Sequence, residues 1–268
     1  MEWLHAVFLG LIQGITEFLP ISSSGHLIIL PYQLGWQDQG LIFDVAVNSG
    51  TLVALLIYFR RDVKDLFIGF VRSLRPGGLE NNQSGYLAWS VALATIPIGV
   101  SGLLVKDKVE EFARDPSIVA YASIVFGVFL WLADRGANSG KNLSRLTWRD
   151  GILIGIGQIF ALIPGASRSG VTMTAGLFLG FDRETSARLS FLMALPVGIL
   201  VGGLEFIELI KSNPSTQELG FVAVGFFVAM FSALMIIKWL LTWVKSRNMT
   251  VFVVYRVLLG IIILLIIP

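Results

Sequence analysis

The feature that most restricts the fold is a series of apolar segments, each close to the roughly 20 residues that an α-helix needs to cross the hydrocarbon core of a bilayer. Charged residues make up only 14% of the chain, against about 25% in ordinary soluble domains. The sequence therefore excludes a soluble fold and predicts an all-α polytopic membrane protein. Six segments are expected to span the membrane: 41–59, 86–105, 117–133, 186–209, 219–241 and 249–267.

Overall charge and cysteine content exclude several other classes. The net charge is only +2, and the basic residues are spread over loops, so nucleic acid is not an expected partner. Without cysteine the chain has neither disulfides nor a thiolate metal site. The first apolar run is interrupted by Gln13 and Glu17 and lacks a preceding basic region, so we expect it to belong to the fold rather than to a cleaved signal peptide.

Two further apolar segments, 6–34 and 151–180, are each broken near the middle by proline, serine and glycine. Proline disfavours helix in the residue before it, and serine is a good N-cap, so each break ends one helix and starts another. The arms on either side are too short to cross a bilayer. We therefore expect two re-entrant helical hairpins whose breaks face the protein interior, because lipid cannot satisfy irregular backbone.

The two breaks also indicate an internal repeat within a single membrane domain, residues 1–268. Pro20 and Pro164 occupy similar positions, and each is followed three residues later by a serine, Ser23 or Ser167. The halves, approximately 1–135 and 136–268, would each hold one hairpin and three spanning helices. An odd number of spans inverts the second half relative to the first, so the hairpins should enter from opposite faces.

Loop charges predict the orientation. Segments 60–75, 134–150 and 242–248 are rich in lysine and arginine and fall on one side, which is therefore predicted to be cytoplasmic. On the other side, acidic residues outnumber basic ones in 106–116, and Lys211 is the only basic residue of 210–218. The first hairpin then enters from outside, the second enters from the cytoplasm, and their tips meet near the midplane.

Ionisable residues beside the breaks need a reason to lie at bilayer depth, where a charge costs about 2.5–3.5 kcal/mol on insertion scales. Gln13 and Glu17 are four residues apart and share a helical face just before the first break. The segment Ser22–Ser24 would begin a half-helix whose N-terminus attracts an anion, with His26 in its first turns.

The second break supplies a planar guanidinium, Arg168, which is suited to bidentate phosphate binding. Its polar neighbours are Ser167, Ser169 and Thr172. Phosphoryl transfer requires mainly positioning and charge neutralisation, which helix N-termini, an arginine and a carboxylate-bound divalent cation supply. Ser23 and His26 are the candidate nucleophiles, with the other of the two, or Glu17, handling the proton.

Each of these residues also has a plain structural interpretation. Glu17 and Arg168 could neutralise one another, the serines could be caps, and His26 could form an interhelical hydrogen bond. Arg256 is expected to be a snorkelling or structural charge. Three further polar residues could border a cavity: Asp44, Asn48 and Arg188.

With these motifs the chain resembles the undecaprenyl-diphosphatase, or bacitracin-resistance, family over essentially its whole length. The segments that carry the resemblance are 13–17, Gln-Gly-Ile-Thr-Glu; 20–26, Pro-Ile-Ser-Ser-Ser-Gly-His; and 164–172, Pro-Gly-Ala-Ser-Arg-Ser-Gly-Val-Thr. The resemblance implies hydrolysis of undecaprenyl diphosphate to undecaprenyl phosphate and inorganic phosphate, which recycles the carrier lipid for cell-wall synthesis. It also implies a bacterial cell membrane location with the site facing outward.

Carried over to this chain, the resemblance gives the polar residues roles. Glu17 would bind a divalent cation, Mg²⁺ or Ca²⁺, or act as acid and base, and Gln13 stands where many members have glutamate, which implies weaker cation binding. Ser23 or His26 would attack phosphorus. The diphosphate would be bound by Arg168 together with Ser22, Ser24, Ser167, Ser169 and Thr172.

The sequence leaves two questions open. The oligomeric state is not determined, a homodimer included. A secondary transporter or lipid translocase is the alternative function, because inverted repeats with broken helices also suit alternating access.

Overall fold

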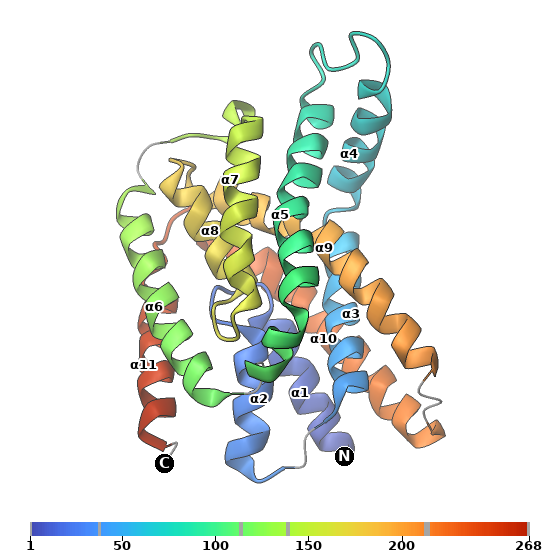
Figure 1. Cartoon of the computed structure of the whole chain (residues 1–268), viewed down its shortest axis with the longest axis vertical. Helices are drawn as coiled ribbons and strands as arrows, with labels where there is room; N and C mark the ends of the chain where they lie inside the picture. The colour runs from blue at the N-terminus through green and yellow to red at the C-terminus, as the bar shows by residue number, and fades with distance from the viewer. Residues whose placement is uncertain (1, 37–38, 113–114, 138–139, 212–214, 267–268) are drawn as a thin grey trace.

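The computed structural model describes residues 2–36, 39–112, 115–137, 140–211 and 215–266, and these residues form a bundle of helices (Figure 1). The one β-bridge among them is isolated and pairs Lys141 with Phe181. In chain order the helices are α1 (Trp3–Thr16), α2 (Ser23–Leu34), α3 (Leu41–Tyr58), α4 (Arg60–Ser73), α5 (Gln83–Phe112), α6 (Pro116–Arg135), η2 (Leu143–Arg145), α7 (Trp148–Gln158), η3 (Ile159–Leu162), α8 (Arg168–Phe178), α9 (Arg183–Lys211), α10 (Thr216–Trp243) and α11 (Thr250–Ile266).

Two pairs of short helices turn back inside the bundle, and they correspond to the two broken segments of the sequence. The pair α1 and α2 approaches from the end where the N-terminus lies, and the pair α7 and α8 approaches from the opposite end (Figure 1). None of the four arms exceeds 14 residues, which is too short to cross a bilayer. Both turns therefore lie in the interior, where they can meet.

The number of long apolar helices is smaller than the predicted number of spans. Among the described residues, four stretches pass tests of length and hydropathy: Gln83–Val105, Pro116–Arg135, Arg183–Gly203 and Thr216–Trp243. The bent pair α3 and α4, with 76° between its helices, brings the number to five if it counts as one span, and α11 is a shorter apolar helix of 17 residues. The chain is thus a multi-pass membrane protein with four to five candidate spans.

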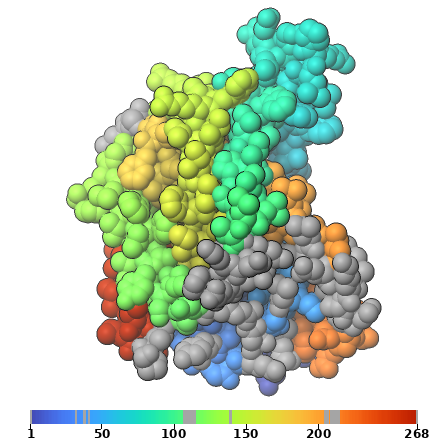
Figure 2. All heavy atoms as spheres, viewed as in Figure 1, coloured from blue at the N-terminus to red at the C-terminus, as the bar shows by residue number. Residues whose placement is uncertain are grey.

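Segment 60–75 is mostly helix, not the loop that the sequence analysis assigned. Helix α4 occupies Arg60–Ser73 and packs against α5, with Gly69 close enough to Gly85 that a Cβ on Gly69 would lie 2.5 Å from the Gly85 nitrogen. The basic residues that suggested a loop are interleaved with apolar ones at helical spacing, so the segment forms an amphipathic helix. Figure 2 shows α4 and the start of α5 rising above the rest of this face.

The basic segments gather at one end of the bundle, as predicted. Asp134 at the end of α6 accepts hydrogen bonds from Arg183 of α9 and from the backbone of Met249 before α11. Tyr86, near the start of α5, stacks on Trp148, the first residue of α7. Residues 106–112 of the predicted acidic loop are instead the last part of helix α5, and residues 113–114, like residues 212–214 of the Lys211 segment, lie outside the described residues.

Small residues let the helices that carry the breaks pack closely against their supports. A Cβ on Gly14 of α1 would lie 1.9 Å from Ser232 Oγ of α10, and a Cβ on Gly155 of α7 would lie 2.5 Å from the Ala94 carbonyl of α5. Such contacts are typical of helix packing in membranes, where close van der Waals fit replaces the hydrophobic drive. Each hairpin is therefore held against a long helix.

Candidate active site

The two breaks are built on the same backbone device. Ser22 and Ser167 each adopt a positive φ, 71° and 70°, which is uncommon outside glycine. The Oγ of each accepts a hydrogen bond from the backbone N–H three residues later, at Gly25 (3.4 Å) and Gly170 (3.2 Å). Each serine thus ends an irregular turn and caps the helix that follows it.

This shared geometry shows which residues of the breaks are equivalent. Ser24 Oγ contacts Ser22 Oγ at 3.3 Å, and Ser169 Oγ contacts Ser167 Oγ at 3.1 Å, two residues after the cap in both cases. The residue between them, at the first position of the helix, is Ser23 in α2 and Arg168 in α8. The candidate nucleophile and the candidate phosphate-binding arginine therefore occupy matching positions.

The sequence analysis had paired Ser23 with Ser167, and this pairing is wrong by one residue. The error arose from aligning Pro20 with Pro164, because the second break has one more residue between its proline and its capping serine. Aligning the caps instead also pairs two glutamines, since Gln13 and Gln158 each lie nine residues before their cap.

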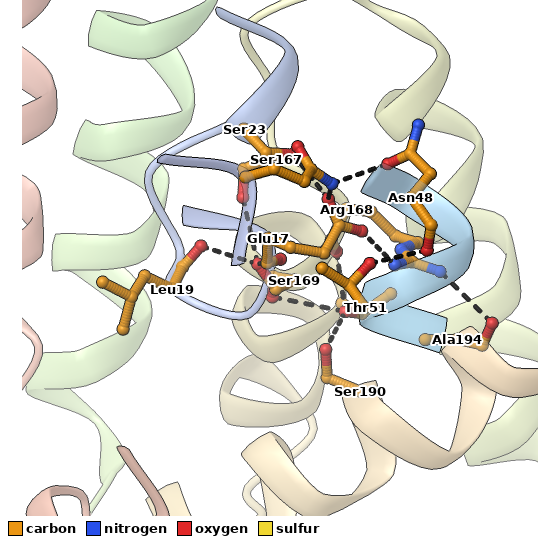
Figure 3. Close-up of polar contacts among 12 residues, drawn as sticks. Glu17, Leu19, Ser23, Asn48, Thr51, Ser167, Arg168, Ser169, Ser190 and Ala194 are labelled. Carbon is orange, nitrogen blue, oxygen red and sulfur yellow. Dashed lines mark hydrogen bonds and ion pairs between the residues drawn. The ribbon is translucent and has the colours of Figure 1, made fainter. Parts of the chain in front are cut away.

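Glu17 joins the two breaks across 151 positions of sequence (Figure 3). Its Oε1 accepts from Arg168 Nη2 at 2.5 Å, and its Oε2 accepts from Ser23 Oγ at 2.5 Å and from Gln13 Nε2 at 3.0 Å. The Glu17 and Arg168 side chains are 14% and 23% exposed, so the ion pair is partly accessible. Four of the predicted site residues therefore form one connected cluster.

Backbone and hydroxyl groups hold this cluster in place. Arg168 Nη1 donates to the Ala194 carbonyl of α9 at 3.2 Å, and Ser169 Oγ donates to the Leu19 carbonyl of the first break at 2.9 Å. Thr172 Oγ1 lies 2.7 Å from the Arg168 carbonyl and 2.6 Å from Ser190 Oγ (Figure 3). Ser169 and Thr172 are buried, so in this arrangement they support the cluster from behind rather than face a ligand.

His26 lies outside the cluster. Its Nδ1 is 2.6 Å from the Ser22 carbonyl, which can only accept, so Nδ1 carries the proton. Its Nε2 is 2.6 Å from the hydroxyl of Tyr255 on α11, and a neutral imidazole accepts there. Both ring nitrogens are therefore engaged away from Glu17 and Arg168.

A cavity of about 460 Å³ opens beside the cluster, and its lining changes from polar to apolar. Glu17, Ser23 and Arg168 form its polar end. The apolar wall comes from helices α3, α5 and α9 and includes Leu52, Leu55, Ile98, Val197 and Val201. A smaller hollow of about 100 Å³ reaches Ser22, Ser24 and Ser167. The space suits a ligand with a polar head and an apolar chain.

Of the three polar residues placed near a cavity, only Asn48 borders it. Asn48 Oδ1 accepts a hydrogen bond from Gln13 Nε2 at 2.6 Å, and Asn48 lines the cavity. Asp44 instead accepts from Gln39 at 2.7 Å, and Arg188 pairs with Asp62. The signal that favours Asn48 is its three-residue spacing from Thr51, which puts both on one face of α3, and both line the cavity.

Oxygen donors for a cation are present, but they are few. Gln13 Oε1 is buried without a hydrogen-bond partner among the described residues, and it belongs to the same cluster as the Glu17 carboxylate. These are the ligand types that Mg²⁺ and Ca²⁺ prefer. The described residues hold no group of three His, Cys, Asp or Glu able to bind a metal, so the chain offers one carboxylate and one amide here.

Comparison with known proteins decides the family. A match to the family described as Bacitracin resistance protein BacA covers residues 6–262. The chain belongs to this family. The undecaprenyl-diphosphatase of Magnetococcus marinus is 55% identical over 265 residues, 98% of each chain. Those of Saccharophagus degradans and Aliivibrio salmonicida are 46% and 45% identical, and both alignments cover 97% of this chain and 96% of the relative. The resemblance predicted from the motifs is confirmed.

Proposed function

We propose that this BacA family member is an integral membrane phosphatase that hydrolyses undecaprenyl diphosphate to undecaprenyl phosphate and inorganic phosphate, which recycles the carrier lipid for cell-wall synthesis. Relatives of this name match the chain over nearly its full length. The observation that carries the proposal is the convergence of Glu17, Ser23 and Arg168 from two broken helices on one cavity with an apolar wall. A transporter or lipid translocase is not favoured.

Binding would begin with the charge on the diphosphate. Helices α2 and α8 both begin at the cluster, and the partial positive charge at a helix N-terminus attracts phosphate. The guanidinium of Arg168 would turn part of its fork from Glu17 to the phosphate oxygens. The prenyl chain would lie against the apolar wall formed by Leu52 and Val197 and leave between the helices.

Ser23 is the nucleophile that the geometry favours over His26. Its hydroxyl already donates to Glu17, which would take the proton as Oγ bonds to the terminal phosphorus. The bond from that phosphorus to the bridging oxygen breaks, and Glu17 gives its proton to the departing oxygen of undecaprenyl phosphate, which leaves Glu17 ionised again. Water activated by Glu17 would then cleave the phosphoserine, and the proton returned to Ser23 Oγ releases phosphate. Direct attack by water is the alternative route.

A divalent cation, Mg²⁺ or Ca²⁺, is part of the proposal, with Glu17 and Gln13 as its protein ligands. Diphosphate oxygens and water would complete its coordination, because the chain provides so few donors. When bound, the cation would neutralise charge on the diphosphate. Since Gln13 adds no negative charge, Glu17 would provide most of the attraction.

The fine topology is also proposed rather than observed. Six spans with two re-entrant hairpins, in inverted halves 1–135 and 136–268, are supported by the matched caps at Ser22 and Ser167 and by hairpins that approach from opposite ends. The basic end would be cytoplasmic, which opens the site to the outer side of the bacterial cell membrane. A homodimer remains a prediction for light scattering in detergent to test.

The deciding experiment measures phosphate release by the purified protein in detergent. With undecaprenyl diphosphate and Mg²⁺ or Ca²⁺, we expect steady release of one phosphate per lipid, which chelator abolishes and added cation restores. The Arg183→Lys variant is a matched control, because its ion pair with Asp134 lies at the far end of the bundle. Release of no phosphate with either cation, from protein that remains monodisperse, would contradict the proposal.

A further inference from the structure

Arg256 is the largest fully buried side chain among the described residues, and its charge has no obvious purpose in a lipid-embedded bundle. It lies in the middle of α11, and the described residues place no carboxylate within ion-pair distance of it. Arg256 was expected to be a snorkelling or a structural charge, and its exposure of 0% excludes the snorkelling alternative. A buried charge is costly, so its contacts must account for its presence.

Those contacts are all backbone carbonyl oxygens, and they come from both breaks. Nη1 donates to the Pro20 carbonyl at 3.1 Å in the first break. Nη2 lies 3.0 Å and 2.8 Å from the carbonyls of Gly165 and Ala166 in the second. Nε donates to the Ser123 carbonyl of α6 at 3.1 Å. One guanidinium thus touches the two irregular turns and the helix between them.

Irregular backbone explains why a charge is used. Carbonyls in a helix break have no intrahelical donor, and lipid offers none, so each would remain unsatisfied at bilayer depth. A guanidinium has five N–H groups in a fixed planar fork, more donors than any other side chain, so it can satisfy several such carbonyls at once. Pro20, Gly165 and Ala166 are therefore held at fixed spacing by one rigid group.

The same group lies directly behind the proposed phosphate site. A Cβ on Gly170, in the first turn of α8, would lie 2.6 Å from Arg256 Nη1, so the two are in close contact. The first residue of that helix is Arg168. The positive charge of Arg256 is not neutralised by a carboxylate among the described residues, and it adds to the field at the N-terminus of α8.

We infer that Arg256 is a positioning residue, which acts through the carbonyls of Pro20, Gly165 and Ala166 to hold the two breaks in register. That register brings Ser23, Glu17 and Arg168 together, and the unneutralised charge strengthens binding of a phosphate anion from behind. The inference rests on the proposed function and deepens it, because it assigns to α11 a part in a site that α1, α2 and α8 line. Tyr255, the residue before Arg256 on α11, forms a hydrogen bond with His26.

Two substitutions separate the two contributions. Arg256→Lys keeps the charge but loses the fork, so the breaks shift while the anion is still attracted. Arg256→Met removes both and leaves an apolar side chain of similar length. Because misplacement by about 1 Å can reduce the rate on the order of a hundredfold, we expect a fall of that size in kcat for both variants.

The inhibition constant of inorganic phosphate, the product, reports the charge independently. We expect it to stay within about threefold of wild type in Arg256→Lys and to rise on the order of tenfold in Arg256→Met, in line with loss of one nearby charge at the effective dielectric of a protein site. A role in stability alone would reduce the amount of folded enzyme but leave the phosphate constant and the kcat per folded molecule unchanged.

The measurement uses full-length protein in detergent, with gel filtration to count folded molecules and Arg183→Lys as the control at a remote ion pair. Wild-type kcat in folded Arg256→Lys would overturn the positioning role, as would failure of that variant to fold, since the inference holds that only the breaks move. An unchanged phosphate constant in Arg256→Met would overturn the electrostatic role. If the wild-type protein releases no phosphate, the proposed function fails, whereas phosphate binding followed by thermal shift still tests Arg256.

Discussion

The two breaks share a backbone design and differ in what they carry. Each has a serine of positive φ that caps the following helix, with a second serine two residues later. At the matching position between the serines, the first break places Ser23 and the second places Arg168. The repeated backbone supplies the geometry, whereas in the proposed function the unlike residues would supply a nucleophile from one half and an anion-binding group from the other.

The comparison also shows why a single half would not suffice. Ser23 and Arg168 meet at the two oxygens of one carboxylate, Glu17, which belongs to the first half alone. The equivalent position in the second half lies five residues before the cap Ser167 and is Leu162, which carries no acid. The site thus depends on an asymmetric sequence placed on a repeated frame.

The largest effect should come from removing the Ser23 hydroxyl while the backbone of the first break stays unchanged. We expect Ser23→Ala to lower kcat on the order of 10³-fold or more, as when other enzymes lose a nucleophile. The same substitution at a helix cap, Ser167→Ala, should lower stability by about 1 kcal/mol. Its loss of kcat should be much smaller than that of Ser23→Ala. Phosphate release and thermal unfolding of both variants check this, and equal losses of kcat would show that Ser23 has no special role.

His26→Ala should also be severely impaired, because His26 ties the first break to α11 through Tyr255. Rapid quenching with labelled substrate then identifies the nucleophile. We expect the label on Ser23, and a phosphorylated His26 would reverse the assignment. Label on neither residue would favour attack by water.

The next largest effect should come from the second break. Arg168→Lys keeps the charge but loses the planar fork, and we expect a fall in kcat/KM of about 10²-fold, comparable to loss of one electrostatic donor in other active sites. The same change at Arg183, which pairs with Asp134 far from the cavity, should leave kcat/KM near wild type. Wild-type rates in Arg168→Lys would mean that the ion pair of Arg168 with Glu17 is structural only.

A smaller effect is expected where the sequence departs from many family members. Gln13→Glu adds a second carboxylate beside Glu17, and more negative charge strengthens cation binding. The concentration of Mg²⁺ or Ca²⁺ that gives half-maximal activity should fall several-fold, because one added carboxylate ligand raises the affinity for the cation. Titration of activity with each cation checks this. A requirement that stays the same or increases would exclude Gln13 as a ligand position.

The smallest effect is expected for Gln158, the residue of the second half that corresponds to Gln13. Gln158 is fully buried, and neither atom of its amide has a hydrogen-bond partner among the described residues. An unsatisfied buried group costs about 1–3 kcal/mol, so Gln158→Leu should raise the unfolding temperature and leave kcat unchanged. A drop in kcat instead would mean that both glutamines serve the reaction and that the halves are less unlike than the structure indicates.

Much of the fold followed from the sequence, because lipid leaves few choices. Runs of about 20 apolar residues can only be helices, and the proline and serine interruptions could only turn inside the protein. Segment 60–75 was missed, since basic residues alternating with apolar ones suit an interfacial helix as well as a loop. The repeat was recognised but aligned on Pro20 and Pro164, because the positive φ that identifies Ser22 and Ser167 as equivalent is not written in the residue type.

The candidate site was predicted less evenly. Glu17, Ser23 and Arg168 were named because charge and hydroxyl groups beside a break are costly in lipid, and they do form one cluster. Nothing local distinguished them from His26, which turns toward α11, or from Thr172, which is buried behind Arg168. Asn48 was only one of three polar residues along the spans until the cavity selected it.

The sequence by itself determined that the chain is a membrane protein, that two of its apolar segments are broken, and which polar residues lie at the breaks. Those conclusions depend on local composition, because the cost of exposing backbone or charge to lipid is set residue by residue. Only the tertiary structure decided which of these residues meet. Contacts between Glu17 and Arg168, or between Arg256 and both breaks, join positions that are 90 to 236 residues apart in sequence, and they depend on how the helices pack.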